Sequence, residues 1–391
     1  GREETQRLHL NPRSGRWLPD HSHLQRHINA AIAYNVWQYF QVTGDMEFLA
    51  AYGAEMILEI ARFWASIAVY NESLDRYEIR GVMGPDEFHD AYPDADSAGL
   101  NNNAYTNLMA VFALNRALEL FHVLHAPDCQ QLCEKLGIEE SEKRRWTEVA
   151  RKMRLVFHGD GILSQFEGYD QLQELDWDAY RERYGDLQRL DRVLEAEGDS
   201  ANRYKLSKQA DVLMLFYLFS AEELADLFKQ LGYAFEYETI PKNIDYYLQR
   251  TSNGSSLSRI IHSWVAARRD RRHSWRLFQE ALKTDVADIQ GGTTREGVHL
   301  GAMAGCMDLI QRCYTGLEAR GEVLRLSPQF PPQLGAIRMH LRYRSHWLEL
   351  EVSCRKVRVE SLAGSVQPLV VEIKGQRVRL EDGKSVVIEL E

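Results

Sequence analysis

The sequence predicts a mainly α protein: an α/α toroid of paired helices followed by a small antiparallel β domain. Apolar residues recur at helical spacing over most of the chain, and helices do not alternate with strands as they do in an α/β protein. Short turns and long loops alternate between the helices, which is typical of a toroid whose long loops gather around a pocket. A helical solenoid is the alternative, but the chain shows no fixed repeat of about 34 to 45 residues.

Two apolar periods indicate the first helices. Residues 24–41 place Ile28, Ile32 and Val36 at helical spacing. A Thr-Gly-Asp turn follows, and a second period then extends over residues 46–68.

Two long segments without a period come next. Residues 70–101 are rich in Gly, Pro, Asp and Asn, and residues 158–206 mix aromatic and acidic residues. Loops of this length in a compact domain are usually functional. Helical periods are predicted at 103–124, 141–157, 207–220, 221–232, 239–251, 258–269, 272–283 and 297–318.

The pattern changes to strict alternation from about residue 337. Lys-Gly-Gln and Glu-Asp-Gly-Lys turns separate the alternating runs, as in an antiparallel sheet. The predicted division is therefore a helical catalytic domain over residues 1–325 and a β-sheet domain over residues 326–391.

Composition excludes several classes of function. The 57 acidic residues exceed the 47 Lys and Arg residues, giving a net charge of −10. The sequence shows no basic stripe with interleaved aromatic residues, so nucleic-acid binding is not expected. No apolar run approaches the ~18 residues of a membrane span. The five cysteines follow no metal-binding spacing, so neither a metal site nor a metal cofactor is expected. These features favour a soluble cytoplasmic protein with reduced thiols.

The motif Gly-Pro-Asp-Glu-Phe-His-Asp at residues 84–90 is the first candidate site. Read alone, the motif is a turn in which the Glu87 side chain caps the backbone or pairs with a nearby group. Its place in a long loop, the neighbouring Phe88 and the Asn run at 101–103 favour a catalytic site. An aromatic neighbour can raise the pKa of a carboxyl group, which suits a general acid at neutral pH. Glu87 is then the candidate acid, and Asp86 an orienting or sugar-binding group.

Two further motifs lie at loop-to-helix junctions. Lys208 and Gln209 precede a strongly apolar helix, where they can face either solvent or the hydroxyl groups of a substrate. Ser255 and Ser256 precede another helix and offer hydroxyl and N–H donors to an anion, although serines at helix starts are mostly caps.

The segment at residues 291–305 contains the fourth motif, Gly-Gly-Thr-Thr-Arg-Glu-Gly-Val-His. A lone His299 at a helix start is more often structural. Together with the threonines and the separate serine pair, it makes a phosphate-sized site credible. The motif is not a nucleotide-binding P-loop, because it lacks the pattern G-x-x-x-x-G-K followed by Ser or Thr.

Together the motifs VMGPDEFHD, NNNAYTN, KQADVLMLFYLF, GSSLS and GTTREGVHLGAMAG resemble glycoside hydrolase family 65. The resemblance extends over the whole chain. It implies an (α/α)6 catalytic barrel followed by a C-terminal β domain, and an inverting phosphorylase of α-linked glucose disaccharides. It also implies a homodimer, and no cofactor beyond inorganic phosphate as co-substrate.

The resemblance assigns a role to each motif. Glu87 would protonate the glycosidic oxygen while phosphate attacks the anomeric carbon from the opposite face, giving β-glucose 1-phosphate and a free sugar. The implied substrate-binding residues are Asp86, His89, Asn102, Lys208, Gln209 and Glu296. The implied phosphate-binding residues are Ser255, Ser256, Thr294 and His299.

Three alternatives remain open. The first is an inverting hydrolase, in which Glu296 or Glu167 would activate water at ~6.5–9.5 Å from the acid. The second is an inactive carbohydrate-binding fragment, because family members carry an N-terminal β-sandwich and first barrel helices that this sequence does not show, so that the toroid is expected to be incomplete. The third is a helical scaffold without a pocket near Glu87.

Overall fold

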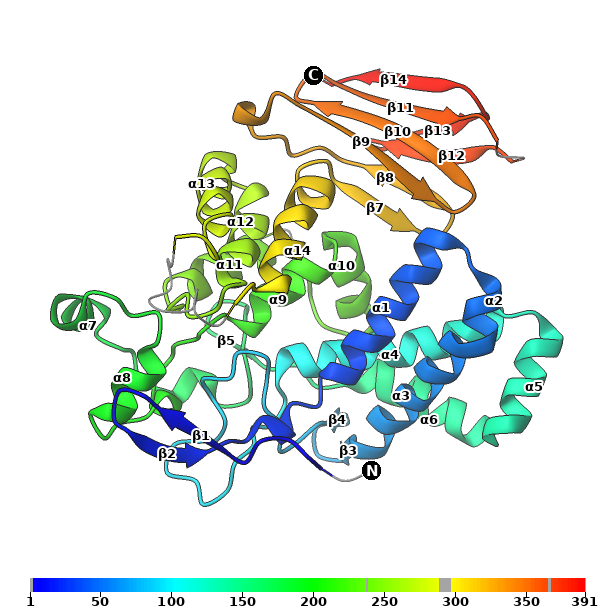
Figure 1. The fold of residues 1–391 in the computed structure, drawn as a ribbon. Helices are drawn as coiled ribbons and strands as arrows, with labels where there is room; N and C mark the ends of the chain where they lie inside the picture. The colour runs from blue at the N-terminus through cyan, green and yellow to red at the C-terminus, as the bar shows by residue number, and fades with distance from the viewer. Residues whose placement is uncertain (1–2, 237, 288–296, 365–366, 391) are drawn as a thin grey trace. The chain divides into compact units, whose positions relative to one another are not determined.

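The computed structural model describes residues 3–236, 238–287, 297–364 and 367–390, and Figure 1 shows its helices and strands. The chain divides into two compact units. Unit 1 comprises Gly1–Tyr34 and Ala54–Ser258, and unit 2 comprises Asn35–Gly53 and Arg259–Glu391. Helix α1 (Ile28–Thr43) contributes residues to both.

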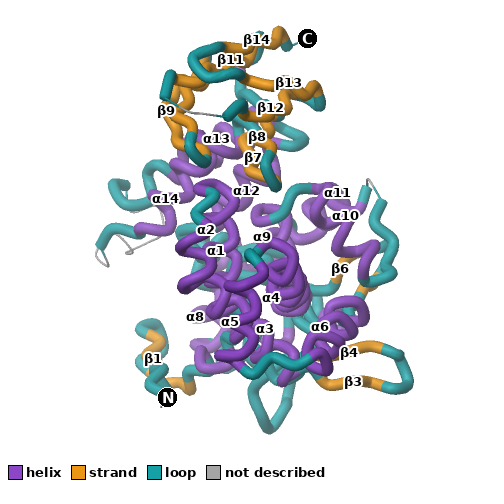
Figure 2. Tube along the Cα trace, turned by 90° about the vertical axis from the view of Figure 1, so that its right-hand side faces the viewer, coloured by secondary structure: helices purple, strands orange, loops and turns teal. Residues whose placement is uncertain are grey.

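Unit 1 is built around the buried helix α4 (Ala104–Val123), which packs against α3, α6 and α9; Figure 2 shows these helices bundled together. Asn103 caps α4 by accepting a hydrogen bond from the Thr106 N–H. The other helices of this unit are α3 (Ala54–Ile67), α5 (Ala126–Leu136), α6 (Glu140–Lys152), α7 (Trp177–Tyr184), α8 (Leu190–Ala196), α9 (Asp211–Leu218), α10 (Ala221–Gln230) and α11 (Thr239–Leu248).

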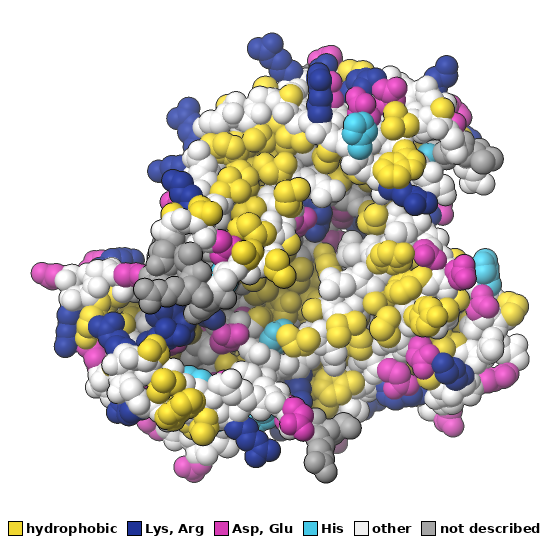
Figure 3. Space-filling view, in the orientation of Figure 1, with side chains coloured by type: hydrophobic (Ala, Val, Ile, Leu, Met, Phe, Trp, Pro, Cys, Tyr) yellow, Lys and Arg dark blue, Asp and Glu magenta, His cyan; other side chains and the backbone are white. Residues whose placement is uncertain are grey.

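Three short antiparallel hairpins complete the described part of unit 1. They are β1–β2 (Leu8–Asn11 and Arg16–Pro19), β3–β4 (Val69–Asn71 and Arg76–Glu78) and β5–β6 (Phe157–His158 and Ile162–Leu163). Hydrophobic side chains gather on the β1–β2 hairpin (Figure 3), where Leu8, Leu10 and Trp17 are exposed. The two segments expected to be irregular thus contain the β3–β4 hairpin, β5–β6 and the short helices α7 and α8.

Unit 2 contains a second set of helices and two four-stranded sheets, with strand orders β14-β11-β10-β9 and β13-β12-β8-β7. Its helices are α2 (Met46–Phe48), α12 (Ser258–Ala267), α13 (Arg271–Ala281) and α14 (Leu300–Asp308). Its strands are β7 (Leu317–Arg320), β8 (Val323–Leu326), β9 (Ala336–Tyr343), β10 (His346–Ser353), β11 (Lys356–Leu362), β12 (Leu369–Ile373), β13 (Gln376–Leu380) and β14 (Ser385–Glu389).

Alternation along these strands creates the core of the β domain. In β10, Leu348, Leu350 and Val352 are buried, whereas the residues between them are more accessible. Val371 and Ile373 of β12 are also fully buried, and the two sheets lie one over the other in Figure 1. The mainly helical chain with a C-terminal β domain agrees with the prediction.

Two details of the β domain differ from the expected pattern. Its first strand begins at Leu317, before the expected boundary at residue 326. Strand β12 pairs with β8 in parallel, while the other pairs are antiparallel. A parallel pair needs a crossover connection, and the β9–β11 meander lies between these two strands in the chain.

A search of the described residues for membrane-spanning helices finds none with the required length and apolar character.

Candidate active site

The loop that carries Glu87 is fixed from one side by Asp86. This carboxylate is buried and accepts hydrogen bonds from the backbone N–H groups of Lys208 at 2.6 Å and Gln209 at 3.1 Å. Gln165 Nε2 donates to its other oxygen at 3.0 Å. Asp86 therefore ties the loop to the segment before α9, and its contacts are structural.

A second buried carboxyl group, Asp211, lies against the first. The Asp86 N–H donates to Asp211 Oδ1, and Asn103 Nδ2 donates to Oδ2, both at 2.7 Å. Burial and the Asp86 charge hold the pKa of Asp211 well above its ordinary value. The fit is so close that a Cβ atom at Gly84 would lie 2.1 Å from Asp211 Oδ2, so glycine is required there.

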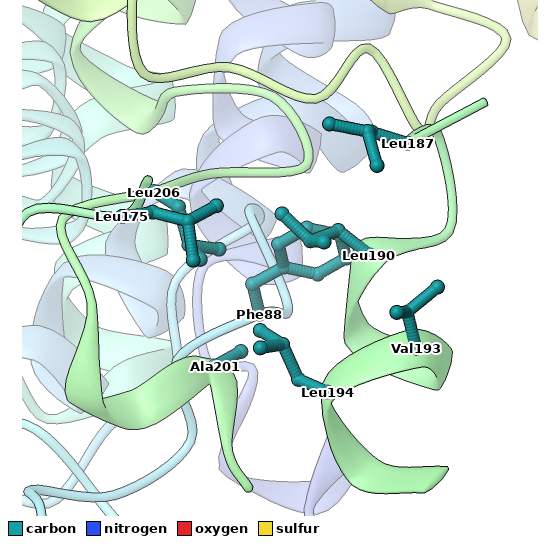
Figure 4. Packing of buried hydrophobic residues seen from close by; sticks show 8 residues of the cluster. All are labelled: Phe88, Leu175, Leu187, Leu190, Val193, Leu194, Ala201 and Leu206. Carbon is teal, nitrogen blue, oxygen red and sulfur yellow. The ribbon is translucent and has the colours of Figure 1, made fainter. Parts of the chain in front are cut away.

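Phe88 anchors the loop on the other side of Glu87. Its ring is buried in an apolar cluster formed mainly by α8 and its flanking segments. Figure 4 shows Phe88 among the surrounding side chains, which are Leu175, Leu187, Leu190, Val193, Leu194, Ala201 and Leu206. The aromatic neighbour thus packs into the core.

Glu87 itself projects from between these anchors. Its backbone adopts a left-handed conformation with φ of 68°, which is uncommon for a residue with a side chain. Its side chain is 47% exposed, and one carboxylate oxygen lies 2.8 Å from Lys208 Nζ. Gln25 Nε2 donates to the other oxygen at 3.4 Å.

A buried histidine lies beside the same loop. His27 is close to the Met83 backbone and contacts Tyr105 edge to face, and the Met83 N–H donates to the Leu24 carbonyl at 3.0 Å. Burial lowers the pKa of His27 to about 4, against smaller opposing effects from the Met83 backbone and the Glu87 charge. His27 is therefore neutral at pH 7.

The serine motif is held against the backbone of Lys208. The Gly254 N–H and the Ser258 hydroxyl both donate to the Lys208 carbonyl, at 3.2 and 3.3 Å. A Cβ atom at Gly254 would lie 2.1 Å from the Gln188 carbonyl oxygen, so the close approach again requires glycine. Ser255 Oγ accepts from the Leu257 N–H at 3.2 Å. Lys208 thus connects two parts of the site: its side chain contacts Glu87, and its backbone carbonyl holds the serine loop.

Glu87 and Lys208 line a pocket of about 460 Å³ within unit 1. Its other walls come from the β1–β2 hairpin, from α8, and from residues 199–202. Several charged side chains face this pocket, including Asp20, His21, Asp90, Arg189, Asp191, Arg192, Glu195 and Asp199.

Three of the expected substrate-binding residues are buried and do not line this pocket. His89 is buried between Asp86, at 3.4 Å, and the Tyr204 carbonyl, at 2.9 Å. Asn102 is fully buried, and its amide donates to Glu167 at 2.9 Å. Gln209 is also buried, and its Oε1 accepts no hydrogen bond from a described residue.

The expected phosphate-binding His299 belongs to unit 2, where it precedes α14. Its Nδ1 lies 2.6 Å from Asp285 Oδ1, and this contact lowers the pKa of Asp285. The predicted residues Thr294 and Glu296 lie outside the described residues.

Sequence reasoning did not single out Gln25, His27 or Asp211. Gln25 and His27 lie in the first turn of the helix predicted over residues 24–41, where polar residues are ordinary, whereas the observed helix α1 begins at Ile28. Asp211 could have been noticed, because it is the acidic first residue of a helix that is otherwise wholly apolar. In the described residues, no three His, Cys, Asp or Glu side chains are grouped as metal ligands.

Family comparison covers both parts of the chain. The model of the glycosyl hydrolase family 65 central catalytic domain matches residues 1–308, and that of the family's C-terminal domain matches residues 317–380.

Individual relatives match nearly the whole of this chain. An uncharacterized glycosyl hydrolase of Mycobacterium tuberculosis is 52% identical over 99% of this chain and 29% of its own length. The trehalose 6-phosphate phosphorylase of Lactococcus lactis is 35% identical over 100% of this chain and 49% of its own. The kojibiose phosphorylase of Halothermothrix orenii is 31% identical over 93% and 44%. The chain thus spans half or less of each of these relatives.

A solved structure shares the fold. A protein from the human microbiome, provisionally assigned as a kojibiose phosphorylase, matches 92% of this chain and 46% of its own with a TM-score of 0.74 and 23% identity. This likeness, with the helices and the β domain described above, confirms the predicted fold class.

Proposed function

The chain belongs to glycoside hydrolase family 65, and on this premise we propose that it carries the catalytic centre of an inverting phosphorylase for an α-glucosidic disaccharide. Relatives named as phosphorylases of trehalose 6-phosphate and kojibiose support this reaction class. The observation that carries the proposal is Glu87, held between two buried anchors and facing Lys208 in a pocket.

In the proposed reaction Glu87 gives its proton to the glycosidic oxygen as the bond to the anomeric carbon breaks. An oxygen of inorganic phosphate forms the new bond to that carbon from the opposite face. The products are β-glucose 1-phosphate and the released sugar, which keeps the proton from Glu87.

Lys208 has two roles in this proposal. Without substrate, its Nζ lies 2.8 Å from a carboxylate oxygen of Glu87 and holds that side chain. With a sugar bound, Lys208 Nζ donates to sugar hydroxyls instead. The proposed phosphate ligands include Ser255 and Ser256, whose loop is attached to the Lys208 carbonyl.

The contacts of Glu167 argue against it as the base of an inverting hydrolase. An inverting hydrolase needs a second carboxylate to activate water. Glu167 lies 2.8 Å from Arg154 and accepts from Asn102 at 2.9 Å, and it does not line the pocket. Because its two oxygens already contact Arg154 and Asn102, Glu167 is a poor base. A phosphorylase needs no such base, because phosphate is already an anion.

Product analysis with α-linked glucose disaccharides, with and without phosphate, tests the proposal. We expect β-glucose 1-phosphate to form only when phosphate is present. We expect Glu87→Gln to lower kcat between about 100-fold and 10,000-fold, while Glu182→Gln, a matched change at an exposed residue of α7, leaves it unchanged. Cleavage at full rate without phosphate would show that the reaction is hydrolysis.

We also propose that the protein acts in the cytoplasm as a homodimer. The acidic net charge and the family resemblance support this proposal. Light scattering of the purified protein and fractionation of cells would test the two statements separately.

A further inference from the structure

A single carboxylate fastens the outer wall of the Glu87 pocket. Glu195 of α8 accepts hydrogen bonds from Asn11 Nδ2 at 2.6 Å and Ser14 Oγ at 2.5 Å, and Arg16 Nε lies 2.6 Å from it. Asn11 also donates to the Arg192 carbonyl at 3.1 Å. The β1–β2 hairpin is thereby attached to α8, and the pocket beside Glu87 has a fixed wall.

The lining of the pocket as a whole carries more acidic than basic side chains. The acidic residues that line the pocket are Asp20, Glu87, Asp90, Asp191, Glu195 and Asp199. Its lysine and arginine residues are Arg189, Arg192 and Lys208, which are half as many.

Some of these basic side chains already form pairs with carboxylates of the pocket. Arg189 faces both oxygens of Asp191, at 3.2 and 2.9 Å, and Lys208 faces Glu87. His21 is engaged in the same way, because its Nδ1 lies 2.7 Å from Asp90 Oδ2.

We propose that this pocket binds the leaving-group half of the disaccharide and selects an uncharged sugar or polyol over its phosphorylated counterpart. This rests on the proposed function, because it concerns the sugar that Glu87 protonates. Sugar hydroxyl groups are donors, and the carboxylates of Asp90, Asp191 and Asp199 are acceptors only. A phosphate monoester, in contrast, brings up to two negative charges among those carboxylates.

The synthetic direction provides the test. The protein is given β-glucose 1-phosphate with matched acceptor pairs, glucose against glucose 6-phosphate and glycerol against glycerol 3-phosphate, and release of inorganic phosphate is measured. We expect kcat/KM for the uncharged member of a pair to exceed that for the phosphorylated member by about tenfold or more.

An Asp191→Asn variant examines the cause. It removes a negative charge and releases the Arg189 guanidinium, so we expect the preference for the uncharged acceptor to fall about tenfold. Asp178→Asn is the matched control, because Asp178 forms a comparable pair with Arg181 on α7 and its side chain is 95% exposed. The control should keep the preference unchanged.

The outcomes separate the two proposals. Equal or faster use of the phosphorylated acceptors would overturn the selectivity and leave the phosphorylase assignment standing. An unchanged preference in Asp191→Asn would show that the pocket does not hold the acceptor. Failure of every acceptor, together with no phosphorolysis of any disaccharide, would overturn the proposed function itself.

Discussion

Around Glu87, polar side chains are buried beside the loop that carries the acid, and His27 is one example. It is 7% exposed and lies close to the Met83 backbone. Folding therefore selects the neutral imidazole, because charge is poorly solvated in that environment.

This burial predicts a pH-dependent loss of stability. The pKa of His27 is about 4 in the folded chain and about 6.5 in the unfolded chain. Between these values the unfolded chain binds more protons, so stability is present above pH 6.5 and is lost as pH falls toward 4. The loss amounts to about 3 kcal/mol.

Urea unfolding of the protein and of His27→Gln at several pH values measures this effect. We expect the variant to lack this part of the pH dependence, so that its disadvantage relative to the unchanged protein shrinks toward pH 4. A stability difference that stays constant from pH 7 to 4 would contradict the prediction.

At the level of elements, the sequence predicts most helices, because a helix leaves a local apolar period. Helix α4, for example, occupies residues expected to be helical. The β1–β2 hairpin was missed, although its Asn-Pro-Arg-Ser-Gly turn between short apolar runs was a visible signal. Its attachment to α8 could not be seen, because Glu195 lies more than 180 residues away from Asn11.

The candidate site was predictable to a similar extent. The motif at residues 84–90 identifies Glu87 through its immediate neighbours. Its contact with Lys208 joins residues 121 positions apart. The local pattern before the apolar helix marked the lysine as a candidate, and the family resemblance gave it a role. The pairing of Asp86 with Asp211 could not be seen in the sequence, because it joins residues 125 positions apart.

The Glu195 contacts lead to a prediction about the hairpin as an element. Replacing Glu195 by Gln removes an ionised acceptor that serves three donors. We expect faster hydrogen exchange of the β1–β2 amides, while α4 keeps its protection. Glu197→Gln is a suitable control, because Glu197 follows α8 but accepts from Tyr180 and Tyr184 instead. Equal exchange in both variants would show that Glu195 does not fix the hairpin.

For the whole molecule, charge is the property that the complete sequence determines. The chain carries 57 acidic and 47 basic residues and has a pI of about 5.8. Such a balance keeps a protein soluble at neutral pH and opposes binding to polyanions.

Chromatography tests this prediction directly. At pH 7.5 and low salt, we expect the protein to bind an anion exchanger and to pass through a heparin column. Retention on heparin that falls with rising salt would reveal a basic surface and would reopen nucleic acids as partners.

The anchoring of Glu87 also limits how the site can adapt. Asp86 and Phe88, on either side of the acid, are both buried, and Asp86 is hydrogen-bonded to a segment more than a hundred residues away. The backbone at Glu87 is thus a fixed pivot, and only the side-chain torsions of the acid can change its reach. A shorter acid at this position cannot be compensated by a shift of the main chain. A protein with this scaffold that evolves to act on a new substrate must therefore change the pocket walls. The new walls must bring the glycosidic oxygen of that substrate to the same position of the Glu87 proton.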